Sequence, residues 1–267
     1  MTPRVSIVLA TYNEPRYLAR ALDSILHQTF TDWELIIVND ASPHTETKKI
    51  LDRYKDSRIR LITNDQNIGS VKSGNKGIRN ARGEFIARLD DDDYWESADK
   101  LTEQVAFLDT HPEHLLVGTN IVVADYDTDV ELYRSQYPQT DEEIRQTFFA
   151  SSPFAHSSVL VRRTAMGSEG NYDECLQRIE DYDLWMKLGT KGKLANLEKH
   201  FVRWHAPSKI KKNVPTIRLA DHIVKLKILW RHRKEYPNFW LNYLKELIKT
   251  IPYYACAKIH RQPTSRQ

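Results

Sequence analysis

Four consecutive aspartates, Asp90–Asp93, directly follow the apolar segment FIARL at 85–89. Neighbouring carboxylates repel each other and raise one another's pKa unless a cation lies between them. Hard divalent cations such as Mg²⁺ and Mn²⁺ prefer oxygen ligands, commonly one or two carboxylates together with substrate phosphates. In an extended chain Asp90 and Asp92 point to the same side. These residues are therefore predicted to hold a divalent cation against a diphosphate. A solvated acidic loop is the alternative, but it does not account for the position after an apolar strand.

A second acidic pair, Glu180 and Asp181, opens the segment EDYDLWMKLG. A carboxylate beside a bound hydroxyl can act as a general base. Acidic residues also stabilise the first turn of a helix. On spacing alone, helix capping is the better interpretation of this pair.

The elements that must position these groups alternate between strand-like and helix-like periodicity over the first ninety residues. The predicted order is a strand at 5–9, a helix beginning at Pro15, a strand at 33–38, a helix at 44–54, a strand at 59–62, a helix at 71–81 and a strand at 84–89. Repeated strand-helix units with short connections predict an α/β fold, with a mostly parallel sheet flanked by helices.

The second half of the chain is less regular. It predicts a helix at 98–110, strands at 115–124 and 157–161, a helix at 180–189 and two basic amphipathic helices at about 216–234 and 239–255. The apolar faces of the last two helices are predicted to contain Leu219, Ile223, Leu226 and Trp230, and Trp240, Leu244, Leu247 and Ile251.

Polar residues follow each of the four predicted N-terminal strands. They occupy 11–14, 39–42, 64–69 and 90–93. In an open α/β sheet, ligands bind beyond the carboxyl ends of the strands. Any one of these segments could be only a turn or a helix cap. Four such segments at one edge predict a ligand site.

Composition limits the class of protein. The 267 residues suit one large domain, or one domain with an appendage, and 40% are apolar, which is enough for a core. The two cysteines, Cys175 and Cys256, have neither metal-site nor disulfide-framework spacing. No segment has the length of a membrane span, and the N-terminus does not resemble a signal peptide. A cytoplasmic protein is expected.

Charge is unevenly distributed along the chain. Residues 203–267 hold 15 Lys and Arg against 3 Asp and Glu, whereas 1–202 hold the remaining 24 against 33. The C-terminal segment therefore carries +12 and the body −9. This asymmetry predicts an anionic partner for the C-terminal segment.

Taken in order, five segments resemble the family 2 glycosyltransferases of bacterial polysaccharide and glycolipid type, which have a GT-A fold. They lie at 5–42, 66–78, 83–95, 153–163 and 180–188, within a resemblance that covers roughly 4–205. The resemblance implies a Rossmann-like GT-A catalytic domain at 1–210, with a nucleotide-binding half at about 1–95 and an acceptor half at about 96–210. Residues 211–267 would form a basic helical extension.

The resemblance also assigns roles to individual residues. It implies that Asp92 binds the metal directly, that Asp90 lies nearer the ribose as a second metal contact, and that Asp181, beside Glu180, is the catalytic base. The substrate and nucleotide contacts that it implies are Thr11, Tyr12, Glu14, Asp40, Asn67, Asn75, Asp90, Asp91, His156, Arg203 and His205.

Four positions depart from the family pattern. Gly74 stands where many relatives have Arg, and Asn39 and Ala41 replace a common Asp and Gly. Lys209 lies where a Ser-Xaa-Ser ending is often found. These departures affect two expected features, which are the binding of the nucleotide base and the phosphate loop at 203–210.

The implied activity is metal-dependent, inverting transfer of a sugar from a nucleotide-diphosphate donor to a hydroxyl group. A UDP-sugar is the expected donor. The expected acceptor is a saccharide, lipid-linked, in cell-surface polysaccharide biosynthesis. Two alternatives to this activity remain open: a catalytically silent nucleotide-sugar-binding protein and a metal-dependent phosphatase with an Asp-Xaa-Asp motif.

Two interpretations of the basic extension are open. Its helices could dock on an anionic membrane surface, which would place the enzyme on the inner face of the membrane. They could instead pack on the catalytic domain and expose a solvated basic face. No segment resembles a reader of nucleic-acid bases, so nucleic acid is not an expected partner.

Overall fold

The computed structural model describes residues 2–43, 45–167, 172–176, 178–206 and 219–259, and only the backbone of 219 and 251–259. Within these ranges, no helix combines the length and apolar character needed to cross a bilayer. Lys209, one of the departures from the family pattern, lies outside the described residues.

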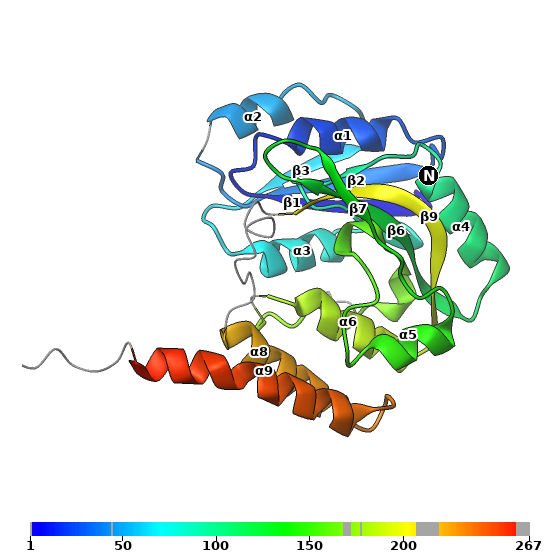
Figure 1. Cartoon of the computed structure of the whole chain (residues 1–267). Helices are drawn as coiled ribbons and strands as arrows, with labels where there is room; N and C mark the ends of the chain where they lie inside the picture. The colour runs from blue at the N-terminus through cyan, green and yellow to red at the C-terminus, as the bar shows by residue number, and fades with distance from the viewer. Residues whose placement is uncertain (1, 44, 168–171, 177, 207–218, 260–267) are drawn as a thin grey trace, which may run out of the picture.

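A mixed sheet forms the centre of the molecule, in the order β3-β2-β1-β4-β8-β6-β9-β5, with β7 paired to β6 (Figure 1). The N-terminal part is parallel, as the sequence predicts. It consists of β1 (Val5–Thr11), β2 (Trp33–Asn39), β3 (Ile59–Thr63) and β4 (Phe85–Arg88). Chain order reverses at β1, which lies between β2 and β4. Ligands bind at such a switch point because the loops separate there.

The second half of the sheet is mostly antiparallel. Its strands are β5 (Tyr94–Trp95), β6 (His114–Asp125), β7 (Glu131–Arg134), β8 (Leu160–Arg162) and β9 (Lys193–Ala206). β6 and β9 are parallel to each other, whereas β8 is antiparallel to both β4 and β6. The strand predicted at 157–161 begins later, because His156–Ser158 form a short 3-10 turn.

Helices cover both faces of the sheet and bury two apolar clusters against it. They are α1 (Leu18–Leu26), α2 (Thr45–Leu51), α3 (Ser70–Arg79), α4 (Lys100–Thr110), α5 (Asp141–Thr147) and α6 (Glu180–Gly189). The predicted start of α1 at Pro15 is wrong. Glu14 accepts hydrogen bonds from the backbone N–H groups of Arg16 and Tyr17, and this turn delays the helix to Leu18.

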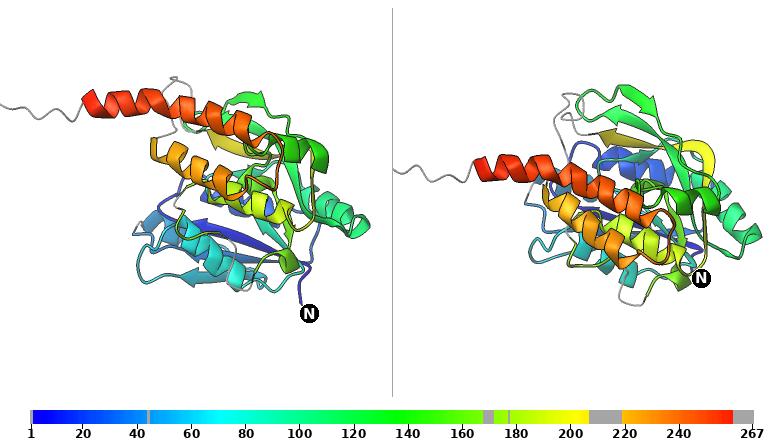
Figure 2. Two further views of the ribbon diagram at one scale, coloured as in Figure 1. Left: turned by 90° about the horizontal axis from the view of Figure 1, so that it is seen from below. Right: turned by 60° about the horizontal axis from the view of Figure 1, so that its bottom comes forward.

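Two further helices, α8 (Leu219–Arg231) and α9 (Phe239–Ile259), form a hairpin beneath α6 (Figures 1 and 2). α8 lies between α6 and α9 (Figure 1). Inside the hairpin the buried Glu246 pairs with His222, and its second oxygen lies 3.3 Å from Lys225 Nζ. This polar contact fixes α9 against α8.

The apolar faces predicted for the hairpin are only partly buried. Ile228, Leu229 and Phe239 pack into the core, whereas Trp230 and Trp240 are exposed. Leu244 and Leu247 on the predicted face of α9 are exposed as well. The helices therefore contact the domain through a different stripe from the one predicted. Polar contacts, such as that of Arg231 with the buried Asp183, also take part.

Candidate active site

A short turn after β4 presents the four aspartates at the carboxyl edge of the sheet. Ser157 Oγ accepts a hydrogen bond from Asp90 N at 3.1 Å and donates one to Asp93 Oδ2 at 2.5 Å. Asp93 Oδ1 accepts a hydrogen bond from His205 N at 3.0 Å, and its side chain is fully buried. Asp93 therefore fixes the turn, which leaves Asp90, Asp91 and Asp92 to face the site.

These three aspartates line a cavity of about 230 Å³. Glu180 also lines this cavity, whereas Asp181 does not, so the two acidic motifs, about ninety residues apart in sequence, meet here. The other lining residues are Ala10, Ser70, Val71, Arg88, His156 and Tyr172.

Crowding of negative charge changes the protonation of this cavity. Burial, together with the charge of Asp90, raises the pKa of Asp92 to about 7. Burial and the charge of Asp92 raise the pKa of Asp91 well above its usual value. Burial acts in the same direction on Asp90, but His156 and Arg88 outweigh it and hold the pKa of this carboxyl below its usual value.

His156 connects Asp90 to Tyr172, which also lines the cavity. Its Nδ1 lies 3.1 Å from Asp90 Oδ2, and its Nε2 lies 2.6 Å from the Tyr172 hydroxyl. Arg88 donates to His156 Nε2 at 3.2 Å and to Asp90 Oδ1 at 3.3 Å. Burial lowers the pKa of His156, but the charge of Asp90 outweighs it and gives a net increase.

Glu180 and Asp181 form the first turn of α6, directly after Ile179 in a left-handed conformation. Asp181 Oδ1 accepts a hydrogen bond from the next backbone N–H, that of Tyr182, at 2.8 Å, so it satisfies one of the free N–H groups of the first turn. Burial raises the pKa of Asp181, and the charge of His156 opposes it. Burial and the charge of Asp181 raise the pKa of Glu180. Both carboxyl groups are therefore stronger bases than free carboxylates.

The loop after β1 forms the next part of this edge. Thr11 is buried and Tyr12 is exposed, and Tyr12 N donates to Asp91 Oδ2 at 3.3 Å. Glu14 Oε2 accepts a hydrogen bond from the Tyr126 hydroxyl at 2.6 Å. The structure thus brings Thr11 and Tyr12 beside the aspartates, while Glu14 is bound to the segment that follows β6.

Two predicted nucleotide contacts make hydrogen bonds within the protein. Asp40 is buried and accepts hydrogen bonds from Ile68 N and Gly69 N at 2.9 and 2.8 Å, which holds the loop after β3. Asn75 is buried on α3 and exchanges hydrogen bonds with the backbone of Tyr172. Asn75 thereby holds Tyr172 against the cavity. Asn67 lies exposed in the loop that Asp40 holds.

Arg203 and His205 lie on β9, beside the aspartate turn. His205 Nδ1 lies 2.5 Å from Asp92 O, and its ring stacks on Tyr17 at 3.9 Å between centroids. Arg203 donates to Glu96 Oε1 at 2.7 Å. These contacts support the turn, and neither side chain lines the cavity.

Sequence patterns do not single out three positions that the structure places at this site. Arg88 is a buried cation within an apolar strand, and that pattern was an available signal. Ser157 follows His156 directly, but a lone serine carries no specific signal. Tyr172 is held at the cavity by tertiary contacts with Asn75 and His156, which no local pattern indicates.

The ligand atoms that line the cavity are of the kind that a divalent cation binds. Asp90, Asp91 and Asp92 supply hard oxygen atoms. Burial and neighbouring carboxylates raise the pKa values of Asp91 and Asp92, and a bound cation would favour their charged forms. Within the described ranges, no group of three or more His, Cys, Asp or Glu side chains is arranged as a complete metal site. Substrate oxygen atoms would have to complete the coordination.

Comparison with known proteins agrees with this geometry. The family model described as glycosyl transferase family 2 matches residues 6–168. An uncharacterized glycosyltransferase of Methanocaldococcus jannaschii is 30% identical over 259 residues, covering 92% of this chain and 87% of the relative. The Escherichia coli UDP-Glc:alpha-D-GlcNAc-diphosphoundecaprenol beta-1,3-glucosyltransferase WfaP is 30% identical over 207 residues, which are 76% of this chain and 78% of WfaP. The chain therefore belongs to glycosyl transferase family 2, and it is a glycosyltransferase of the bacterial polysaccharide type.

Solved structures give the fold independently. TarS of S. aureus in complex with UDP-GlcNAc superposes with a TM-score of 0.69 at 18% identity, covering 95% of this chain and 73% of that structure. The mannosyltransferase PcManGT of Pyrobaculum calidifontis, in complex with GDP-Man and Mn2+, gives a TM-score of 0.67 at 17% identity, with coverages of 100% and 77%. The predicted GT-A fold is confirmed.

Proposed function

We propose that this glycosyltransferase moves a sugar, with inversion, from a UDP-sugar to a hydroxyl group of a lipid-linked saccharide in cell-surface polysaccharide biosynthesis. The main supporting observation is the cavity that Asp90, Asp91 and Asp92 line together with Glu180. WfaP, by its name, transfers glucose from UDP-Glc to a diphosphoundecaprenol-linked sugar. TarS was solved with UDP-GlcNAc.

Asp92 and Asp90 are the proposed ligands of Mg²⁺ or Mn²⁺. When bound, such a cation neutralises charge that develops on the nucleoside diphosphate leaving group. Mn2+ accompanies GDP-Man in the PcManGT structure. The proposed nucleotide contacts are Thr11, Tyr12, Glu14, Asn67 and Asp91. Asp40 and Asn75 are buried, and they are proposed to act on the nucleotide through the loop after β3 and through Tyr172, which they hold. Arg203 and His205 are proposed to act near the diphosphate through the turn that they support.

Asp181 is the proposed general base. Inverting transfer needs a group that accepts the proton of the acceptor hydroxyl as the new bond forms. Burial raises the pKa of Asp181, which brings its basicity closer to neutral pH. Glu180 beside it would orient the acceptor, and His156 would contact the transferred sugar.

The basic hairpin is proposed to dock on an anionic membrane. Trp240, Leu244 and Ile248 recur every four residues along α9 and are 65%, 54% and 64% exposed. Lys245 and Lys249 lie beside this stripe and are exposed. An amphipathic helix with an apolar face and flanking lysines is suited to the lipid interface. We accordingly assign 1–210 to catalysis, with nucleotide binding in 1–95 and acceptor binding in 96–210, and 211–267 to docking.

Calorimetric titration of the whole chain with UDP, GDP and dTDP, each with Mn²⁺ and with EDTA, tests the donor assignment. Tight binding of UDP only when Mn²⁺ is present is the expected result. If none of the three binds the folded protein with Mn²⁺, the donor assignment is wrong. Binding without turnover on any lipid-linked acceptor would instead favour a nucleotide-sugar-binding protein.

A further inference from the structure

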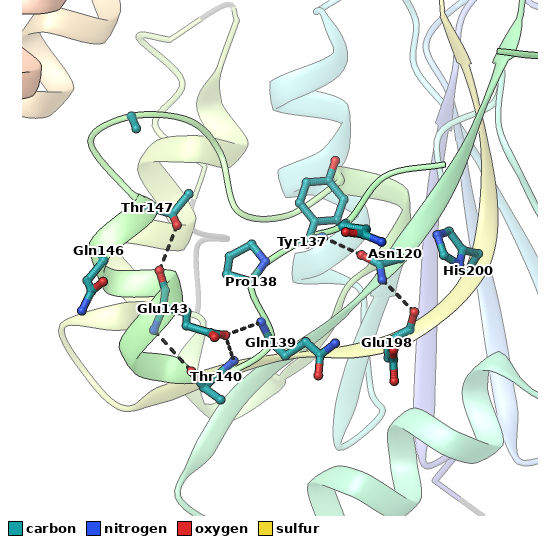
Figure 3. A pocket seen from close by; sticks show the side chains of 12 residues that line it. Asn120, Tyr137, Pro138, Gln139, Thr140, Glu143, Gln146, Thr147, Glu198 and His200 are labelled. Carbon is teal, nitrogen blue, oxygen red and sulfur yellow. Dashed lines mark hydrogen bonds between the residues drawn. The ribbon is translucent and has the colours of Figure 1, made fainter. Parts of the chain in front are cut away.

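A groove of about 800 Å³ lies between the loop at 136–140, α5 and the middle of β9 (Figure 3). It does not include the aspartate cavity, and the proposed transfer step uses none of its residues. Its volume is that of an ordinary small-molecule site.

The frame of the groove is held by hydrogen bonds. Asn120 Oδ1 accepts one from Tyr137 N at 2.6 Å, and its amide donates to Glu198 O at 2.7 Å. Glu143 Oε2 accepts hydrogen bonds from Gln139 N and from Thr140 N at 3.0 and 3.1 Å (Figure 3). The loop and β9 are thereby joined, so the groove is built before any ligand arrives.

Several polar side chains of the groove remain available for a ligand. In the part of the chain that the structure describes, no hydrogen bond occupies the side chains of Gln136, Gln139, Gln146 or Glu198, and all four are exposed. Figure 3 shows Gln139 extending from the loop toward the strand that carries Glu198. Amide and carboxylate groups pair readily with hydroxyl groups, since together they both donate and accept hydrogen bonds.

The same lining argues against an anionic ligand. Glu143 and Glu198 both line the groove, and among its described lining residues none is Lys or Arg. A phosphate or nucleotide would therefore lack a counter-charge there. Tyr137 adds an aromatic ring, which suits the apolar face of a sugar.

Asn196 relates the groove to the aspartate cavity. Its amide donates hydrogen bonds to Pro138 O at 2.7 Å and to Pro153 O at 3.0 Å. Pro138 lines the groove, and Pro153 lies three residues before His156, which lines the aspartate cavity. Ala150 also lines the groove, and its O accepts a hydrogen bond from Lys225 of α8 at 3.2 Å.

We infer that this groove is a binding subsite for an uncharged oligosaccharide, and that it holds the acceptor glycan beyond the sugar that reacts. The assignment to the acceptor glycan rests on the proposed function, because it requires a saccharide acceptor. The assignment as an oligosaccharide-binding groove does not, since it concerns binding alone.

Binding alone is tested on a glycan array with the fluorescently labelled full chain. The wild type is expected to bind uncharged oligosaccharides, and Gln139→Ala/Glu198→Ala to lose at least tenfold in affinity. Glu142→Ala is the matched control, because Glu142 is exposed on α5 but does not line the groove. Absence of binding by the wild type, or retention of binding by the double variant, would overturn the subsite. Both substituted side chains are exposed, so an unchanged melting temperature is expected. If the double variant unfolds, Gln139→Ala alone gives the answer.

A second assay compares acceptors with one sugar and with three sugars on the same lipid diphosphate. The double variant is expected to raise the KM of the three-sugar acceptor at least tenfold, with kcat and the one-sugar acceptor unchanged. An equal effect on both acceptors would contradict a distal subsite. If the wild type transfers to neither acceptor, the proposed function fails, while the array still decides whether the groove binds saccharide.

Discussion

Arg231 on α8 donates to Asp183 on α6, with 2.7 Å between Nη1 and Oδ1. Asp183 is fully buried and lies two residues after Asp181. Its other oxygen lies 2.6 Å from Lys187 Nζ, and Arg231 also reaches Asp173 at 3.0 Å. The helix that carries the proposed base is therefore joined by an ion-pair network to the hairpin proposed to dock on the membrane.

Removing the arginine should loosen this junction. Arg231→Ala leaves a buried carboxylate with fewer partners, which we expect to lower the free energy of unfolding by about 1–3 kcal/mol. Arg231→Lys should restore part of the loss. Lys227→Ala, exposed on the same helix, is the control and should change little. Urea denaturation measures the effect, and equal stability of Arg231→Ala and wild type would show that the contact does not hold the hairpin.

The same network predicts a dependence of stability on pH. His232, Lys187 and Arg231 outweigh burial and lower the pKa of Asp183 from 3.8 to about 2. A carboxyl group whose pKa is lower in the folded than in the unfolded protein stabilises the fold at pH values above its unfolded pKa. That stabilisation is lost as the pH falls to the folded pKa. The wild type should therefore lose about 2 kcal/mol between pH 4 and pH 2 through this group.

Asp183→Asn tests this origin of acid sensitivity. The variant should be less stable than the wild type at pH 7, and the difference should narrow as pH falls to 2. Denaturation curves at pH 7, 4 and 2.5 give the comparison. A difference that stays constant over this range would exclude titration of Asp183 as the cause.

Replacement of the proposed base separates chemistry from binding. Asp181→Asn should lower kcat by roughly 10²–10⁴-fold, the usual contribution of a general base. Donor affinity should stay within a few-fold of the wild type, because the role proposed for Asp181 concerns the acceptor hydroxyl and not the nucleotide. Glu180→Gln should retain more activity than Asp181→Asn. If Asp181→Asn turned over at nearly the wild-type rate, Asp181 would not be the general base and another residue would have to be.

Asp92→Ala should remove the dependence of donor binding on metal. The remaining carboxylates offer too few ligands to hold Mn²⁺ against the diphosphate. Titration with the nucleotide, with and without Mn²⁺, measures this loss. Asp52→Ala, an exposed aspartate after α2, should behave as the wild type. Unchanged metal-dependent binding in Asp92→Ala would refute its assignment as a ligand.

Local sequence patterns predicted the parallel half of the sheet, because buried strands and amphipathic helices leave clear periodicities. They also predicted the acidic turn, since Asp90 to Asp93 end an apolar strand. Tyr172 could not be predicted, because its position depends on Asn75, ninety-seven residues earlier. The outward stripe of α9 could not be predicted either. Helical periodicity identifies an apolar face, but only tertiary packing determines whether that face is covered.

That outward stripe gives the last prediction. The wild type should co-sediment with liposomes that contain phosphatidylglycerol, and less so as salt rises, because each well-placed lysine contributes up to about 1 kcal/mol through screened attraction. Trp240→Ser/Leu244→Ser/Ile248→Ser should weaken binding at least tenfold, since it removes the apolar side chains that would enter the interface.

Leu61→Ser/Val130→Ser is the matched control, because these side chains are also exposed and apolar but do not belong to the hairpin. It should bind liposomes as the wild type does. If the wild type does not sediment with anionic liposomes at low salt, the hairpin has another partner. If the triple variant sediments as the wild type does, other parts of the surface hold the lipid. Loss of binding in the triple variant alone would place the lipid contact on α9, on the side of the hairpin away from the Arg231–Asp183 pair that joins α8 to α6.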